Sequence, residues 1–263
     1  MLAEERRKRI LELVQSQGFA SLTELADTLE VSESTVRRDL GHLEERGVAK
    51  RTHGGVFYAG GSPNLPHFAE RSPEQWEPKR AIAREAARLI ADDDTLLLDG
   101  GSTTYEVARF LVGRPLQVVT NSLPVANLFA SNANTDLILV GGYISPRTGV
   151  ALGPYANEMI SGLSVRRTVL SIGGATERGF YNSNLLLVET ERAMLDAADE
   201  VIVVADSSKF GHQSLACLCP LDRIDRLVVD DRLSESWQQR LKRAGVDVTL
   251  AAIEQPTPTR KKA

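Results

Sequence analysis

The segment from Ser34 to Val56, STVRRDLGHLEERGVAKRTHGGV, decides the fold of the first part of the chain. Its apolar residues Val36, Leu40 and Leu43 share one face of a helix expected over about 34–46. Gly47 ends that helix. The residues that follow, VAKRTHGGVFY, predict a two-stranded turn. A helix followed by a small β-hairpin is the second half of a winged helix-turn-helix domain.

Two further helices are expected before this segment. Residues 4–17 carry apolar side chains at helical spacing, and Gly18 ends that pattern. Ser21 and Glu24 have the spacing of a capping box, which predicts the start of a second helix. Four residues form the apolar face of this helix: Leu22, Leu25, Ala26 and Leu29. A short turn, EVSES, leads into the third helix, so residues 1–58 predict a winged helix-turn-helix domain.

The polar and basic residues of this domain are candidates for binding double-stranded DNA. In a helix-turn-helix domain, the first turns of the second helix reach base edges in the major groove. Arginine suits bidentate contact with guanine, and residues of the wing meet phosphates or the minor groove. The candidates are Ser34, Thr35, Arg37, Arg38 and His42 on the helix, and Lys50, Arg51 and His53 in the wing.

The distribution of charge favours this interpretation. Residues 34–58 hold five basic and three acidic residues, a net charge of +2, within a chain whose net charge is -4. The positive charge is therefore segregated, as groove binding requires. The alternative is a solvated charged face on a small helical domain.

Composition limits the remaining possibilities. The chain has 263 residues, 42 % of them hydrophobic, enough for a small domain and a larger one. No apolar run approaches the ~20 residues that span a bilayer, and the first residues, MLAEERRKRILELV, lack the apolar core of a signal peptide. A cytoplasmic location is expected. Cys217 and Cys219 are too few for a zinc site, so neither a metal nor a cofactor is expected.

After residue 58 the pattern changes. Residues 59–78 are rich in glycine and proline and predict a linker. Residues 79–253 alternate short apolar runs with amphipathic stretches, which predicts an α/β domain with a parallel sheet buried on both faces. Residues 254–263 predict a disordered tail.

Five of the predicted strands end on small or polar residues. These ends comprise residues 99–104, 120–122, 141–142, 173–174 and 206–209, and they include Gly101 and Gly141. The carboxyl ends of parallel strands meet at one edge, where ligands bind. Glycine lets backbone N–H groups approach a phosphate, serine and threonine add hydroxyls, and Lys209 adds a positive charge. The pattern therefore predicts a phosphorylated sugar or polyol, although each Gly-Gly pair alone is also typical of a tight turn.

The segment 34–56 closely resembles the DNA-binding signature of DeoR-type transcriptional regulators. In that signature a helix beginning S-x-x-T-x-R-R-D-L is followed by L-x-x-x-G and by a wing ending in R-x-H-G-G. The matching positions are Ser32, Thr35, Arg37, Arg38, Asp39, Leu40, Leu43, Gly47, Arg51, His53, Gly54 and Gly55.

The segments LDGGSTT, VVTNSLPVA, LVGG, SIGGATERGF and VADSSKFG resemble the sensor domain of the same regulators. The resemblance implies a fold similar to ribose-5-phosphate isomerases, a phosphorylated sugar as effector, and relief of repression as the response. A homo-oligomer, either a dimer or a tetramer, is expected because such regulators bind paired half-sites. By motif position, the residues that would face the effector are Asp99, Ser102, Thr103, Thr104, Asn121, Ser122, Gly173 and Lys209.

One helix departs from the family pattern. The family commonly has E-x-x-K-R-A-M or E-V-K-x-A-M there, whereas this chain has VETERAML. Glu189 and Met194 match, but Glu191 stands where lysine is usual. An acid there would change the charge balance of the pocket and the choice of sugar, with Tyr181 and Asn182 available to bind hydroxyls. The alternative is that Glu191 only caps or solvates the helix.

The leading hypothesis is a transcriptional regulator, and more specifically a repressor of carbohydrate genes. An alternative is a sugar-phosphate isomerase fused to a DNA-binding module, in which Asp99, Glu189 or Asp206 would supply the base. A third interpretation is a DNA-binding module with a purely structural second domain.

Overall fold

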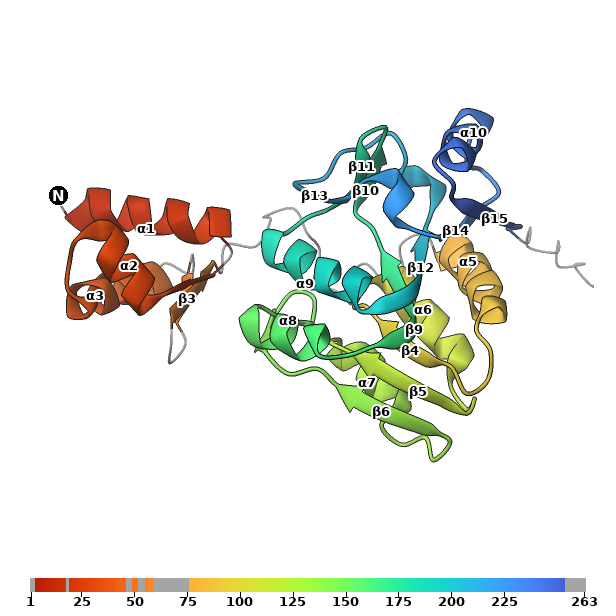
Figure 1. Ribbon diagram of the computed structural model, residues 1–263, viewed down its shortest axis with the longest axis horizontal. Helices are drawn as coiled ribbons and strands as arrows, with labels where there is room; N and C mark the ends of the chain where they lie inside the picture. Colours follow the sequence, from red (N-terminus) through yellow and green to blue (C-terminus); the bar gives the residue numbers. More distant parts are fainter. Residues whose placement is uncertain (1–2, 18, 46–48, 52–54, 59–75, 254–263) are drawn as a thin grey trace, which may run out of the picture.

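The computed structural model describes residues 3–17, 19–45, 49–51, 55–58 and 76–253 (Figure 1). The first part contains α1 (Ala3–Gln17), β1 (Phe19–Ser21), α2 (Leu22–Leu29), α3 (Glu33–Glu45), β2 (Ala49–Arg51) and β3 (Gly55–Tyr58). The three strands form an antiparallel sheet in the order β1-β3-β2. The three predicted helices and the wing are confirmed. Strand β1 was not predicted, because three residues carry too little pattern.

Helices α1–α3 enclose one apolar core. Ile10, Leu25, Val36 and Leu40 are almost completely buried in it, as their spacing predicted. The capping box is confirmed: the Glu24 N–H donates to Ser21 Oγ at 3.1 Å, and the Ser21 N–H donates to Glu24 Oε2 at 2.9 Å. Such a cap satisfies two N–H groups that a helix start leaves without partners.

The second part is built on a seven-stranded sheet in the order β15-β14-β12-β9-β4-β5-β6. Every neighbouring pair is parallel, so the predicted parallel sheet is confirmed. The strands are β4 (Thr95–Leu98), β5 (Leu116–Thr120), β6 (Thr135–Leu139), β9 (Val165–Ser171), β12 (Ala198–Ala205), β14 (Arg226–Asp230) and β15 (Asp247–Ala251). The structure adds β15 to the strands singled out from the sequence.

Helices cover both faces of this sheet (Figure 1). Alternate strand residues point to opposite faces: Leu96 and Leu98 pack in one apolar core, and Leu97 packs in the other. The helices are α5 (Trp76–Leu89), α6 (Ser102–Leu111) and α7 (Leu123–Phe129) on the first face, and α8 (Pro154–Ser161), α9 (Leu185–Asp196) and α10 (Glu235–Arg243) on the second. Helix α5 begins three residues before the predicted start at residue 79. The remainder of the predicted linker, 59–75, and the predicted tail, 254–263, lie outside the described residues.

Short strands lie at the edge where the parallel strands end, here called the carboxyl edge. β7 (Tyr143–Ile144) and β8 (Ala151–Leu152) form a hairpin, and β10 (Gly174–Thr176), β11 (Gly179–Asn182) and β13 (Ala216–Cys219) form a small antiparallel sheet. Two short 3₁₀ helices, η1 (Ser207–Lys209) and η2 (Leu221–Arg223), follow β12 and β13. These elements were not predicted, because strands this short show no reliable alternation.

Ion pairs fix the opposite, amino edge of the sheet. Arg167 bonds Asp94 and, at 2.6 Å, Glu200. Arg226 continues the network to Glu200 at 3.2 Å and to Asp247 at 2.8 Å. The acidic side chains named here therefore each face a guanidinium group, which offsets the cost of removing them from water.

Candidate functional site

Helix α3 presents a polar face. Ser34, Arg37, Arg38 and His42 are exposed and Thr35 is half-buried, as predicted for residues that face DNA. The Ser32 hydroxyl lies 2.8 Å from Ser34 Oγ and 3.0 Å from Thr35 Oγ1. The first turn of α3 therefore displays hydroxyl groups next to two exposed guanidinium groups.

The wing is joined to α3 through Arg51. Its Nε donates to Glu44 Oε2 at 2.7 Å, and its Nη1 donates to the Arg37 carbonyl at 3.5 Å. Arg51 therefore aligns β2 with α3. Lys50 lies on β2, but its side chain and all of His53 fall outside the described residues.

Asp39 has a structural role that its place in the signature does not reveal. It is 2 % exposed and accepts bonds from Arg6 Nε at 2.5 Å and Arg7 Nε at 3.0 Å. These pairs join α1 to α3. The acid at the centre of α3 is thus neutralised inside the domain and does not oppose the positive charge of the exposed face.

Asp99 is the centre of the second candidate site. It directly follows β4 and is 2 % exposed. Its Oδ2 accepts from the Ser171 N–H at 2.9 Å and from Ser171 Oγ at 3.1 Å, and its Oδ1 accepts from the Gly101 N–H at 2.9 Å. Ser171 ends β9, the neighbouring strand. Ser171 was not predicted, although a polar residue at the end of an apolar run is the signal that would have identified it.

The first turn of α6 adjoins this carboxylate. Gly101 is the N-cap, and Ser102, Thr103 and Thr104 are buried behind it. The first N–H groups of a helix have no partner within the helix and favour an anion. The Thr104 hydroxyl lies close enough to Asp99 to lower its pKa, but it makes no hydrogen bond of normal geometry.

Asn121 and Ser122 follow β5 and are both buried. Asn121 Nδ2 donates to the Ala151 carbonyl at 3.0 Å, which ties this strand end to the β7–β8 hairpin. Ser122 caps α7 by accepting from the Val125 N–H at 3.3 Å. The Asn121 side-chain oxygen keeps no partner among the described residues.

Asn182 and Glu191 bring β11 and α9 to the same place. Asn182 Nδ2 donates to Glu191 Oε1 at 2.7 Å and to the Ser171 carbonyl at 3.4 Å. Glu191 is 1 % exposed. The interpretation of Glu191 as a solvated helix residue is therefore wrong. Its spacing from Val188 and Met194, both buried, would have placed it on the inner face of the helix.

The other predicted residues are placed less centrally. Glu189 is half-buried, and burial raises its pKa while Arg192 lowers it; Arg192 in turn binds carbonyls of β13. Tyr181 is buried on β11, whereas Gly141 and Gly173 are exposed at strand ends. Lys209 is half-buried on η1, where its N–H donates to the Asp206 carbonyl at 3.1 Å. Among the described residues, the side chains of Glu189 and Lys209 form no hydrogen bond or ion pair with Asp99.

Among the described residues, the carboxyl groups of Asp99 and Glu191 have no positively charged partner. Burial raises the pKa of Asp99, and burial together with the nearby charge of Asp99 raises the pKa of Glu191 well above its ordinary value. No lysine or arginine in the described parts of the chain forms an ion pair with either group. Two buried carboxyl groups so placed retain a proton more readily than exposed ones, and Glu191 is the more strongly shifted of the pair.

Several buried oxygens at the carboxyl edge make no hydrogen bond to described protein groups. They are Thr104 Oγ1, Asn121 Oδ1, Thr148 Oγ1, Ser183 Oγ and Glu191 Oε2. Buried polar atoms are rarely left unsatisfied in proteins, so such a cluster marks a place where water or a ligand supplies the missing partners.

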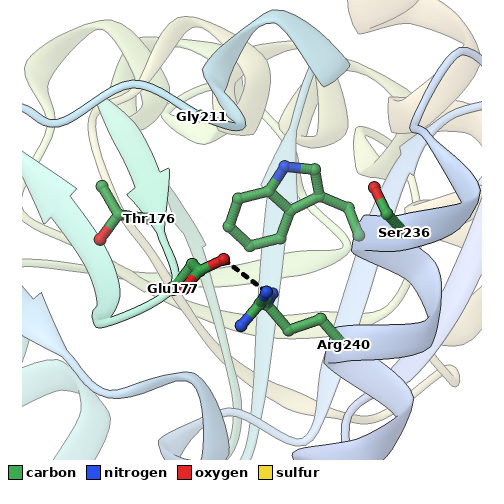
Figure 2. A pocket seen from close by; sticks show the side chains of 6 residues that line it. Thr176, Glu177, Gly211, Ser236 and Arg240 are labelled. Carbon is green, nitrogen blue, oxygen red and sulfur yellow. Dashed lines mark hydrogen bonds and ion pairs between the residues drawn. The ribbon is translucent and has the colours of Figure 1, made fainter.

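A separate hollow lies beside α10 (Figure 2). Its volume is about 330 Å³, and its lining comprises Thr176, Glu177, Gly211, Ser236, Trp237 and Arg240. Arg240 is paired with Glu177 at 2.5 Å, and Trp237 packs edge-on against Phe210. None of the predicted effector residues lines this hollow.

Comparison with known proteins agrees with both halves of the structure. A family model described as "DeoR-like helix-turn-helix domain" matches residues 6–59, and one described as "DeoR C terminal sensor domain" matches residues 74–231. This chain belongs to the DeoR family of transcriptional regulators. The DeoR resemblance of the sequence is thereby confirmed.

DeoR-type relatives match the chain over most of its length. It is 31 % identical over 96 % of its residues to "Uncharacterized HTH-type transcriptional regulator YulB" of Bacillus subtilis, covering 98 % of that protein. It is 34 % identical over 86 % of its residues to the "Glycerol-3-phosphate regulon repressor" of Escherichia coli, covering 90 % of it. These relatives are named as regulators, which favours the regulator over the isomerase hypothesis.

Among solved structures, a ribose 5-phosphate isomerase A from Methanocaldococcus jannaschii aligns with 50 % of this chain and 53 % of its own, at 17 % identity and a TM-score of 0.37. In the described part of the chain, no helix has the length and apolar character to cross a membrane. The same residues contain no group of three or more side chains suited to holding a metal ion.

Proposed function

We propose that this DeoR-family regulator is a repressor of carbohydrate-metabolism genes whose DNA binding is modulated by a phosphorylated sugar or polyol at the carboxyl edge. The observation that carries the proposal is the group of buried, unpartnered oxygens around Asp99, Asn121 and Glu191. A domain with only a structural role gains nothing from leaving such atoms unsatisfied, because each costs stability.

The DNA-binding half of the proposal rests on α3. Arg37 and Arg38 are exposed on its first turns, and the ion pair that Arg37 forms with Glu33, at 3.3 Å, lies on the exposed surface, so both side chains can reach a major groove. Arg51 holds the wing against the same helix. A pair of such domains would bind two half-sites, so a homo-oligomer, dimer or tetramer, is part of the proposal.

The effector half rests on the chemistry of the strand ends. The first turn of α6 offers N–H groups to an anion, and Lys209 offers a positive charge on η1. The amide and carboxyl groups at the same edge offer hydrogen bonds to hydroxyls. One relative, 34 % identical, is named for glycerol 3-phosphate, a phosphorylated polyol.

Fluorescence anisotropy of the full chain on DNA from upstream of its own gene tests the proposal. The titration is repeated at one fixed salt concentration with a panel of sugar phosphates, polyol phosphates and free sugars, since affinity for DNA depends strongly on salt. A phosphorylated compound that weakens the complex at least tenfold supports the proposal. Tight DNA binding that no compound of the panel alters would contradict the effector site.

A further inference from the structure

The geometry points to Asp99, Asn182 and Glu191 as the part of the effector site that recognises hydroxyl groups and excludes a phosphate. This inference rests on the proposed function and adds the chemistry of one end of the ligand. It predicts an effector with a phosphate at one end and neutral hydroxyls at the other. A bisphosphate of the same skeleton would be rejected.

A chain of hydrogen bonds through Ser171 joins Asp99, Asn182 and Glu191. Glu191 Oε1 accepts from Asn182, Asn182 also donates to the Ser171 carbonyl, and Ser171 donates twice to Asp99. Two carboxyl groups from α9 and from the end of β4 are thus held on one short polar path.

Two oxygen atoms on or beside this hydrogen-bond chain lack a partner among the described residues. Glu191 Oε2 is buried and has no hydrogen-bond partner among the described residues, and neither has Thr104 Oγ1 beside Asp99. A hydroxyl group donates one bond and accepts others, so it satisfies a carboxyl oxygen whether that group is protonated or ionised. Phosphate oxygens at neutral pH act chiefly as acceptors and bring negative charge, so at Glu191 Oε2 they would add a third acidic group beside two carboxyl groups, whereas at the first turn of α6 the N–H groups offset their charge.

The two edges of the sheet differ in how their acidic groups are compensated. At the amino edge, Asp94 and Glu200 are compensated by Arg167. At the carboxyl edge, the titratable groups of the described residues that interact with Glu191 are Asp99 and Cys219 of β13, and neither is a cation. A site that took phosphate here would need a positive group at this point, as anion sites generally do.

Matched ligand pairs test the inference in the full chain. Isothermal titration calorimetry compares sugar monophosphates with the bisphosphates of the same sugars, with inorganic phosphate and with the free sugars. We expect at least one monophosphate to bind at least tenfold more tightly than its bisphosphate. If no member of the panel binds, the proposed function itself fails; if a bisphosphate binds as tightly as its monophosphate, only the present inference fails.

Two substitutions at Glu191 separate recognition from folding. Glu191→Gln keeps a group that donates and accepts, so monophosphate affinity should stay within about threefold of the parent protein. Glu191→Leu fills similar space without polar atoms, so affinity should fall at least tenfold while the protein remains folded. Parent-like affinity in Glu191→Leu would overturn the assignment.

A charge reversal gives the opposite test. Glu191→Lys places an ammonium group beside Asp99, and it should lower the preference for monophosphate over bisphosphate by at least tenfold. Glu158→Lys, the same change at an exposed position of α8, is the control and should leave the preference unchanged. An unaltered preference in a folded Glu191→Lys protein would also overturn the inference.

Discussion

Asn182 donates a hydrogen bond to Glu191 across 2.7 Å, and this contact holds an acidic side chain in a buried position where no cation of the described residues pairs with it. The neighbouring Asp99 is buried too, and its charge adds to the effect of burial in raising the pKa of Glu191. The carboxyl edge of the sheet therefore stores an unfavourable arrangement that the amino edge avoids. Such arrangements are found more often at functional sites than in purely structural cores.

The pH dependence of stability should reveal this arrangement. A carboxyl group whose pKa is raised in the folded state contributes fully to stability below its unfolded pKa, and the contribution is lost as pH rises toward the folded pKa. Glu191→Gln removes this titrating group, so the free energy of unfolding of the variant should rise relative to that of the parent protein as pH increases. Within that window the gain is about 1.4 kcal/mol per pH unit.

Urea denaturation of both proteins at pH 5 and pH 8 measures this gain. The ordinary value for a glutamate is 4.5, so both conditions lie above the unfolded pKa. Glu177→Gln, at an exposed position, serves as the control and should show no comparable trend. A difference in free energy of unfolding between Glu191→Gln and the parent that is equal at both pH values would refute the raised pKa of Glu191.

Gly101 should be intolerant of a side chain. A Cβ atom there would lie 1.6 Å from Ser171 Oγ and 2.7 Å from Ser171 Cβ. Gly101→Ala must therefore push Ser171 away from Asp99, at a cost of about 1–3 kcal/mol for the displaced packing. We expect the effector concentration needed to change DNA binding to rise at least tenfold, while DNA binding without effector is retained.

Gly162→Ala is the matched control for this substitution. Gly162 caps the end of α8 with φ near -85°, and the nearest atom to an added Cβ is at 3.6 Å. Its response to the effector should equal that of the parent protein, as measured by anisotropy on the same DNA. A parent-like response in Gly101→Ala would show that the bonds from Ser171 to Asp99 do not support effector binding.

The sequence predicted the sheet and its helices because short runs rich in β-branched residues, such as 201–205, alternate with longer amphipathic stretches. It did not predict β7, β8 or β10, because two or three residues show no periodicity. It counted Glu189 among the effector-binding candidates and treated Glu191 only as a change of charge beside the pocket, since matching a motif says which residues are similar and not which face of a helix they occupy. The ion pairs of Asp39 could not be predicted for a different reason: its partners Arg6 and Arg7 lie 33 and 32 positions away in the chain.

The exposed arginines of α3 should contribute differently from arginines elsewhere. Arg38→Ala or Arg37→Ala should weaken binding to the specific DNA by about 1–3 kcal/mol and relax the base preference at one position, if the side chain contacts a base. If the side chain contacts a phosphate instead, the substitution should weaken binding to all DNA sequences alike. It should also reduce the slope of log affinity against log salt concentration by about one. Anisotropy on the native site and on single-base variants, over a range of salt concentrations, distinguishes the two cases.

Arg88→Ala provides the control for charge. Arg88 is exposed on α5, paired with Glu85, and the substitution changes the net charge by the same amount. We expect it to leave DNA affinity unchanged. If Arg37→Ala and Arg38→Ala were equally silent, α3 would not be the recognition helix.

Asp39 should matter for stability rather than for direct contact with DNA. Its carboxylate joins α1 to α3 through Arg6 and Arg7, whose side chains are 13 % and 26 % exposed. Asp39→Ala would leave both guanidinium groups without this partner and should destabilise the helical domain by about 2–3 kcal/mol, less than for a fully buried pair because Arg7 reaches water. Hydrogen exchange of the α3 amides reports this change directly. The control is Glu33→Ala, which removes an exposed ion pair with Arg37. The side chains of Arg37 and Glu33 are 61 % and 45 % exposed, so the free energy of unfolding should change by less than about 0.5 kcal/mol. Equal exchange rates in Asp39→Ala and Glu33→Ala would mean that the two arginines find water as good a partner as Asp39.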